Sequence, residues 1–178
     1  MAVLDPLRRF GRFSLFFYNP NIQPLLEFRR RLTGIQVLAD RERLDLVMDD
    51  RYDPKAFLRR TEPWDRPARC LACWQMRLAE TARVARETGC EAFTTTLLGS
   101  VHQDHEAIRR IGEAEAPALG PRFHYEDWRP LAAEGHAEAR RMNLYRQQYC
   151  GCLFSEEERY SSTREYLYRG GQSRGGAT

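Results

Sequence analysis

The chain has 178 residues, of which 42% are hydrophobic and 30% are charged, and its formal net charge is +3. This length suits one domain that buries its own core, and no apolar run approaches the roughly 18 residues that suggest a membrane-spanning helix. The N-terminus lacks the basic-then-apolar pattern of a signal peptide, so we expect a cytoplasmic protein. The small net charge does not by itself indicate a nucleic-acid partner, although the basic residues are almost all arginines.

The first part of the chain predicts alternating helices and strands. Residues 1–12 predict a helix, and the apolar run over 13–18 predicts a buried strand that leads into an Asn-Pro-Asn loop. Residues 24–41 carry apolar side chains at three- and four-residue steps, which predicts an amphipathic helix. We interpret its Arg29-Arg30-Arg31 run as a solvated face, and residues 44–48 as the next strand.

The second part continues the alternation. A charged, proline-rich loop over 49–68 leads to a Cys-x-x-Cys pair, and a helix is predicted from that pair to a stop at Gly89. Residues 92–98 are the clearest predicted strand, because their β-branched threonines disfavour a helix. Three further elements follow, namely a helix over 103–115, a short strand over 122–125 and a helix over 131–143.

This alternation with short connections predicts an α/β fold, in which a mostly parallel sheet carries helices on both faces. We expect one catalytic domain over residues 1–160 and a flexible tail, rich in Ser, Gly and Arg, over 161–178. In such a sheet the site lies beyond the carboxyl ends of the strands.

Cys70 and Cys73 are the first candidates for chemistry. Both stand at the predicted start of a helix, where unpaired N–H groups and the helix dipole favour a thiolate. Five cysteines in a chain of this kind indicate metal-binding or catalytic thiols rather than a disulfide framework. Cys90 precedes an apolar strand, and we interpret it as an inert buried thiol.

Cys150-Gly151-Cys152 forms a second thiol pair. A disulfide across one residue requires a sharp bend that Gly151 permits, and such a strained bond suits a reversible two-electron couple. Unlinked thiols or two further cluster ligands are equally compatible with the spacing. Four thiols fit an iron–sulfur cluster, whereas a zinc ribbon would normally have two matching Cys-x-x-Cys knuckles.

Four segments together resemble the cobalamin-independent epoxyqueuosine reductase family. They are an aromatic run through Tyr18-Asn19-Pro20-Asn21, the helix start Arg69-Cys70-x-x-Cys73, the threonine strand Phe93-Thr94-Thr95-Thr96 and the late pair Tyr149-Cys150-Gly151-Cys152. The resemblance covers about Leu4 to Tyr160. It implies an oxidoreductase that reduces epoxyqueuosine to queuosine at the tRNA wobble position, with a [4Fe–4S] cluster and a fold similar to nucleotide-binding α-hydrolases.

The sequence departs from that family at its start. Family members begin with a strand that ends in Cys-Cys-Ala-Pro-Cys, whose first two cysteines join the Cys-x-x-Cys pair as cluster ligands. Here Met1 to Leu4 match the helix after that motif. We therefore expect an N-terminally truncated chain that lacks the first strand, binds the cluster incompletely through Cys70 and Cys73, and is impaired in activity.

Loss of oxygen from an epoxide requires two electrons and an acid. Our hypothesis is that Cys150 and Cys152 react with the substrate and close to a disulfide, which the cluster then reduces with electrons from an unidentified donor. We predict that the two cysteine pairs face each other across one pocket. The residues expected to line its wall are Tyr18, Asn19, Thr96 and Arg146.

Several assignments remain open from sequence alone. The acid candidates are Asp50, Asp53 and Asp127, and the weak candidates for a second metal site are His102 and His105. A zinc-binding RNA module without catalysis and a thiol-disulfide oxidoreductase that acts on proteins are the rival functions.

Overall fold

The computed structural model describes residues 3–117 and 120–163, so most of the predicted tail lies outside the described residues. Its helices are α1 (Leu4–Arg8), α2 (Leu25–Glu42), α3 (Pro54–Arg60), α4 (Ala68–Glu87), α5 (His105–Glu115), α6 (Ala132–Arg141) and α7 (Leu153–Tyr160). Its strands are β1 (Leu15–Phe17), β2 (Leu46–Met48), β3 (Ala92–Phe93) and β4 (Arg122–Phe123), with short 3-10 helices η1 (Thr96–Gly99) and η2 (Arg129–Leu131). The protein is thus a mostly helical α/β structure.

The strands form two separate parallel pairs instead of the one continuous sheet that the sequence predicted. β1 pairs with β2, and β3 pairs with β4. The predicted strand 92–98 is much shorter than expected, because the threonine side chains compete for backbone groups. Thr94 Oγ1 donates to the carbonyl of His124 at 2.8 Å, and Thr95 Oγ1 accepts the N–H of Leu97 and so caps η1.

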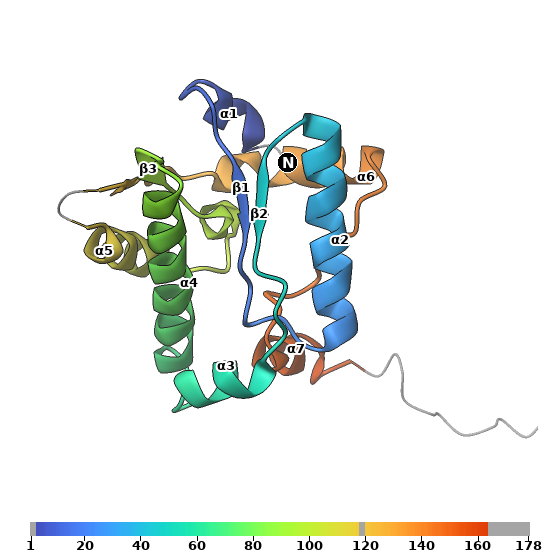
Figure 1. Ribbon diagram of the computed structural model, residues 1–178. Coiled ribbons are helices and arrows are strands. Elements are labelled where there is room, and N and C mark those ends of the chain that lie inside the picture. Colours follow the sequence, from blue (N-terminus) through green and yellow to red (C-terminus); the bar gives the residue numbers. More distant parts are fainter. Residues whose placement is uncertain (1–2, 118–119, 164–178) are drawn as a thin grey trace, which may run out of the picture.

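Helices flank the β1–β2 pair on opposite sides (Figure 1). The long helix α2 covers one side, where Phe28 packs against Phe17 and Ile22. Helix α4 lies on the other side and packs extensively against α5. The largest core lies between α4, α5, β3 and η1, around the fully buried Leu98 and Ile108. The predicted α/β class is therefore confirmed, although helices cover two small strand pairs and not the faces of one continuous sheet.

Two helices were not predicted from the sequence. Helix α3 lies inside the expected loop 49–68; Asp53 caps it by accepting the N–H of Ala56 at 2.9 Å, and Pro54 occupies its first turn. Helix α7 follows Cys152 directly. Both helices are too short for an apolar period to stand out in the sequence.

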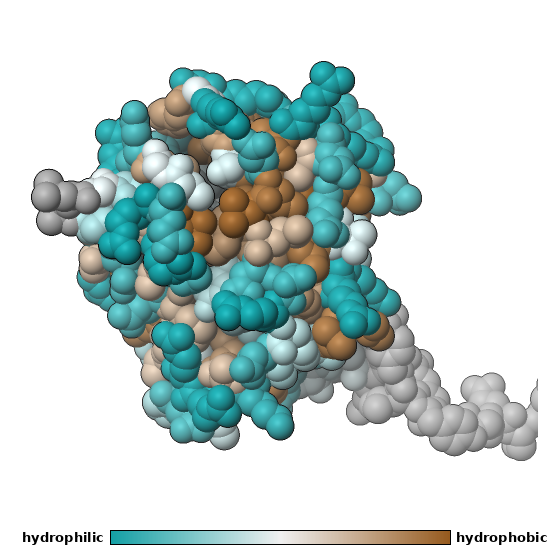
Figure 2. All heavy atoms as spheres, viewed as in Figure 1, coloured by the Kyte–Doolittle hydropathy of each residue, from teal (hydrophilic) through white to brown (hydrophobic). Residues whose placement is uncertain are grey.

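The carboxyl ends of β1 and β2 point toward the end of the molecule where α3, the start of α4 and α7 meet (Figure 1). On the face shown in Figure 2, apolar side chains gather over β1 and β2. A groove of about 340 Å³ lies there, with Phe16, Val47 and Val84 among its apolar lining residues. In the described part of the chain, no helix is both long and apolar enough to cross a membrane.

Candidate active site

The predicted helix behind the first cysteine pair is confirmed. Helix α4 begins at Ala68, so Cys70 lies in its first turn and Cys73 in the next, three residues apart on one side. Burial raises the pKa of Cys73 to about 12, and the positive charge and hydrogen bond of Arg77 only partly oppose this. The helix start therefore does not produce a thiolate at Cys73, because desolvation outweighs the dipole at that depth.

The second pair forms a tight loop that presents one thiol to solvent and buries the other. Cys150 and Cys152 are both free thiols, with their Sγ atoms 3.8 Å apart. Cys150 is exposed and Cys152 is buried. Gly151 has a φ of +125°, a left-handed conformation that confirms the predicted need for glycine between the cysteines.

The two thiols differ in acidity. The hydrogen bond from Cys152 lowers the pKa of Cys150 well below the ordinary range, and the nearby Ser155 hydroxyl and the charge of Arg77 add to this. The same interaction with Cys150, together with burial, raises the pKa of Cys152. The Cys152 sulfur also accepts the N–H of Ser155 at the start of α7, 3.4 Å away. The loop thus holds an exposed thiol of lowered pKa beside a buried thiol of raised pKa.

One cysteine of each pair, Cys73 and Cys152, belongs to the same small apolar cluster. Cys152 is buried in a small apolar cluster with Phe57 and Met76, and Cys73 packs against the same cluster. The charge of Cys150 contributes to the raised pKa of Cys73. The pKa of Arg66 is raised overall: its burial lowers the pKa, but the combined charges of Cys70, Glu158 and Cys150 raise it by more. Arg66 therefore faces both pairs.

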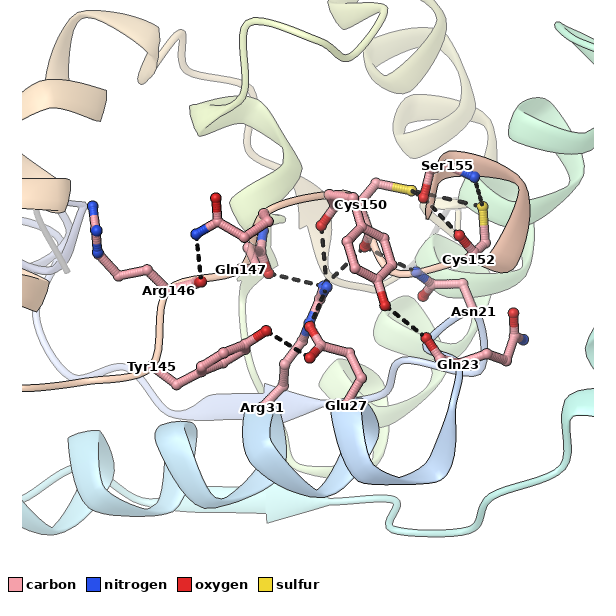
Figure 3. Close-up of polar contacts among 12 residues, drawn as sticks. Asn21, Gln23, Glu27, Arg31, Tyr145, Arg146, Gln147, Cys150, Cys152 and Ser155 are labelled. Atoms are coloured by element: carbon pink, nitrogen blue, oxygen red, sulfur yellow. Dashed lines mark hydrogen bonds and ion pairs between the residues drawn. The ribbon is translucent and has the colours of Figure 1, made fainter. Parts of the chain in front are cut away.

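Helix α2 holds the dithiol loop in place (Figure 3). Arg31 donates to the carbonyls of Cys150 and Tyr149 at 2.9 and 3.1 Å, and its guanidinium pairs with Glu27 at 2.7 Å. Glu27 in turn accepts the hydroxyl of Tyr145 at 2.6 Å. The interpretation of the arginine run as a solvated face is wrong for Arg31, because its side chain is only 9% exposed and binds the loop.

Backbone contacts just before α2 complete this attachment. The N–H of Gln23 donates to the carbonyl of Gly151 at 2.8 Å, and its side-chain oxygen accepts the N–H of Leu153, which opens α7. Asn21 Nδ2 lies 3.3 Å from the carbonyl of Cys150. The loop that follows β1 and the loop that carries the dithiol are therefore one structural unit, although about 130 residues separate them.

The structure places two of the four predicted wall residues at this site. Tyr18 packs against the cluster that contains Cys152, and Asn19 accepts a hydrogen bond of 2.9 Å from Arg77. Thr96 lies in η1, beside the main core. Arg146 is exposed, and its side chain points away from the thiols (Figure 3). Its direction could not be predicted because residues 143–152 form no periodic element.

Two of the three acid candidates, Asp53 and Asp127, have structural partners. Asp53 caps α3, and Asp127 accepts two hydrogen bonds from the Arg129 side chain, which hold its pKa low, at about 2. Asp50 lines the groove over β1 and β2, which contains no cysteine. Cys90 packs against the main core but is only partly buried, so the prediction of a buried thiol is not confirmed.

Of the histidines suggested for a second metal, His105 begins α5 and His102 lies in the turn just before it. His105 is buried, with Nε2 at 3.3 Å from the carbonyl of Ser100 and its ring edge-on to Tyr125. Within residues 3–117 and 120–163, no three Cys, His, Asp or Glu side chains converge to hold a metal ion. Cys70 and Cys73 fit as two thiolate donors, whereas a [4Fe–4S] cluster or a structural zinc site takes four ligands. The described residues therefore do not complete either centre by themselves.

Sequence reasoning missed several residues that shape the site. Arg66, Glu27 and Ser155 carried no motif signal for a role beside the thiols. Ser155 stands at the third position of α7 and donates to the carbonyl of Cys152 at 2.7 Å, a local pattern that is visible only once Cys152 is known to begin a helix.

Comparison with known proteins identifies the family of this chain. A family model described as epoxyqueuosine reductase QueH matches residues 1–158. The chain is 35% identical to the epoxyqueuosine reductase QueH of Dehalococcoides mccartyi, over 83% of this chain and 80% of that protein. It is 33% identical to the protein of the same name from Thermotoga maritima, over 82% and 80% of the two chains. A match of this extent shows that the chain, with its thiol pairs at the starts of α4 and α7, belongs to the epoxyqueuosine reductase QueH family.

Proposed function

We propose that this protein reduces epoxyqueuosine to queuosine at the wobble position of tRNA, the last step in the synthesis of that base. Family membership supports the reaction class, and the dithiol loop supports the chemistry. The observation that carries the proposal is the 3.8 Å separation between an exposed Cys150 of lowered pKa and a buried Cys152. The parallel strand pairs between helices also support the proposed nucleotide-binding α-hydrolase-like architecture.

The dithiol supplies the two electrons that the reaction needs. The Cys150 thiolate attacks one epoxide carbon, so that a C–S bond forms, a C–O bond breaks and the oxygen takes a proton from solvent. Cys152 then attacks the Cys150 sulfur. The S–S bond forms while the C–S bond breaks, its electron pair becomes the C=C bond, and hydroxide leaves as water with the proton of Cys152. Two thiols are oxidised and the epoxide is reduced, and a two-electron donor must then reduce the disulfide.

Each surrounding residue has a defined part in this scheme. The exposure of Cys150 lets the flipped base reach it, while burial of Cys152 keeps the second thiol protonated until the mixed intermediate forms. Arg31 and Gln23 hold the loop carbonyls and so fix the distance between the thiols. Arg77 bears positive charge toward Cys150 and binds Asn19, which places the loop after β1 at the same site. Tyr18 and Asn19 remain our proposed substrate contacts.

We also propose that Cys70 and Cys73 are two thiolate ligands of a [4Fe–4S] cluster, whose other ligands are not among the described residues. In protein purified without oxygen, Cys73→Ala should remove most of the bound iron, because a lost thiolate opens the cluster to water. Cys90→Ala is the matched control and should keep its iron. Equal iron in the two variants would refute this ligand assignment.

The reaction is tested with tRNA that carries epoxyqueuosine and a small dithiol as reductant. The nucleosides released after digestion are separated and identified by mass spectrometry. Wild-type protein should convert epoxyqueuosine to queuosine, and Cys150→Ser should abolish conversion. In a single turnover without the small dithiol, Cys152→Ser should stop at a covalent adduct between Cys150 and the RNA, because no thiol is then present to resolve it. A Cys150→Ser variant with wild-type turnover would overturn the dithiol mechanism.

A further inference from the structure

Trp64 differs from the other tryptophans because its ring lies at the surface. It is 47% exposed, whereas Trp74 and Trp128 are 7% and 1% exposed. It lies in the short connection between α3 and α4, and its indole N–H donates to the carbonyl of Leu58 at 3.1 Å. This hydrogen bond fixes the plane of the ring. Trp64 is therefore a large, oriented aromatic surface that is open to solvent.

The ring forms the outer layer of a stack. Phe154 of α7 lies against it, with the ring centroids 6.1 Å apart and the planes at 28°. The guanidinium of Arg69 lies 5.2 Å from the centre of the Phe154 ring, and it also donates to the carbonyl of Trp64 at 2.7 Å. Arg69 is further held by an ion pair with Glu158. Residues of three helices thus contact Trp64 and hold it in place: Leu58 of α3, Arg69 of α4 and Phe154 of α7.

This stack is continuous with the dithiol site. Phe154 follows Cys152 by two residues and packs against the apolar cluster in which Cys152 is buried. The Ser155 hydroxyl, next in the chain, lies 3.1 Å from the sulfur of Cys150. Two adjacent residues of α7 therefore connect the two places, because Phe154 contacts Trp64 and Ser155 contacts Cys150.

The surroundings of Trp64 favour stacking over a purely electrostatic contact. Arg59, Arg60 and Arg66 are exposed nearby in the chain, but Glu62 and Asp65 are exposed on the same connection and offset much of their charge. A site that binds mainly through phosphates would carry a stronger positive excess. An oriented aromatic face between arginines matches the way proteins bind unpaired bases of single-stranded RNA.

We propose that Trp64 is a stacking platform for an unpaired nucleobase of the RNA substrate, adjacent to the base that reaches Cys150. This inference rests on the proposed function for the identity of the RNA, and it adds a binding site outside the reacting centre. The stacked base anchors the anticodon loop while its neighbour is flipped toward the thiols.

The test measures binding without turnover. An RNA hairpin with the sequence of the tRNA anticodon arm, carrying ordinary guanine at the wobble position, is titrated into the protein. Because the other two tryptophans are buried, stacking on Trp64 should quench the intrinsic fluorescence, and Trp64→Phe should abolish the quenching. Anisotropy of a labelled hairpin should show that Trp64→Phe binds within about threefold of wild type, whereas Trp64→Leu loses about 5- to 150-fold in affinity.

Controls separate this site from folding and from catalysis. Trp64→Leu keeps an apolar side chain against Phe154, so its thermal unfolding and its rate of Cys150 alkylation should match those of wild type. Phe10→Leu changes another exposed aromatic, which stacks edge-on with His124, and should bind RNA normally. The proposal that a base stacks on Trp64 is refuted if the wild-type protein does not bind the hairpin, if Trp64→Leu binds it with wild-type affinity, or if fluorescence quenching persists in Trp64→Phe. Normal RNA binding without reduction of epoxyqueuosine would instead overturn the proposed function alone.

Discussion

The buried ion pair between Glu27 and Arg31 provides a sharp test of how the dithiol loop is held. The two side chains are 6% and 9% exposed, and Arg31 also donates to the carbonyls of Tyr149 and Cys150. Arg31→Met keeps much of the side-chain volume but leaves the Glu27 carboxylate buried without its cation. Removing one partner of a buried pair typically costs about 3–5 kcal/mol. Because Glu27 keeps its hydrogen bond from Tyr145, we expect Arg31→Met to lower the free energy of unfolding by about 3 kcal/mol, near the lower end of that range.

For a chain of this size, such a loss lowers the midpoint of thermal unfolding by about 6–12 °C. Urea unfolding of the reduced protein measures the free energy directly. Mass spectrometry after a short alkylation pulse should also show that Cys152, protected in wild type, becomes reactive when the loop carbonyls lose Arg31. Arg29→Met is the matched control, since Arg29 is exposed on the same helix, and it should change the unfolding free energy by less than about 0.5 kcal/mol.

A double variant separates the charge effect from lost packing. Glu27→Gln with Arg31→Met removes both charges while Gln keeps an acceptor for Tyr145, so it should be more stable than Arg31→Met alone by at least about 1 kcal/mol. The reasoning is refuted if Arg31→Met is within about 1 kcal/mol of wild type, or if the double variant is no more stable than the single one.

Two other predictions concern the dithiol loop itself. Gly151→Ala should destabilise the protein by about 1–3 kcal/mol in urea unfolding, because φ is +125° and a Cβ would meet Arg31 Nη1 at 3.0 Å. Gly34→Ala is the control: Gly34 lies in the middle of a helix with open space around it, so this change should be neutral or stabilising. Equal effects at the two glycines would contradict the strained geometry. Cys150 should be alkylated with a pH midpoint well below that of an ordinary thiol, and Cys152→Ala should move that midpoint upward, because the hydrogen bond that lowers the pKa of Cys150 is lost. An unchanged pH profile in Cys152→Ala would show that another group activates Cys150.

Local sequence patterns determined the main helices and the bend between Cys150 and Cys152. The apolar period of α2 and the composition of the segments that form α4 and α5 are local properties, and the structure confirms all three helices to within a few residues. The glycine between Cys150 and Cys152 likewise indicated a sharp bend, because only glycine adopts such a φ readily. These features follow from steric and periodic rules that act within one segment.

Tertiary contacts decided the rest of the site. Residues 143–152 have no periodic pattern, so their path depends on Arg31 and Gln23, which lie more than one hundred residues earlier. The same dependence explains why Arg31 turns inward while Arg29, two residues before it, faces solvent. Sequence could place Cys73 at a helix start, but its raised pKa comes from burial, and burial is a property of the whole packed structure.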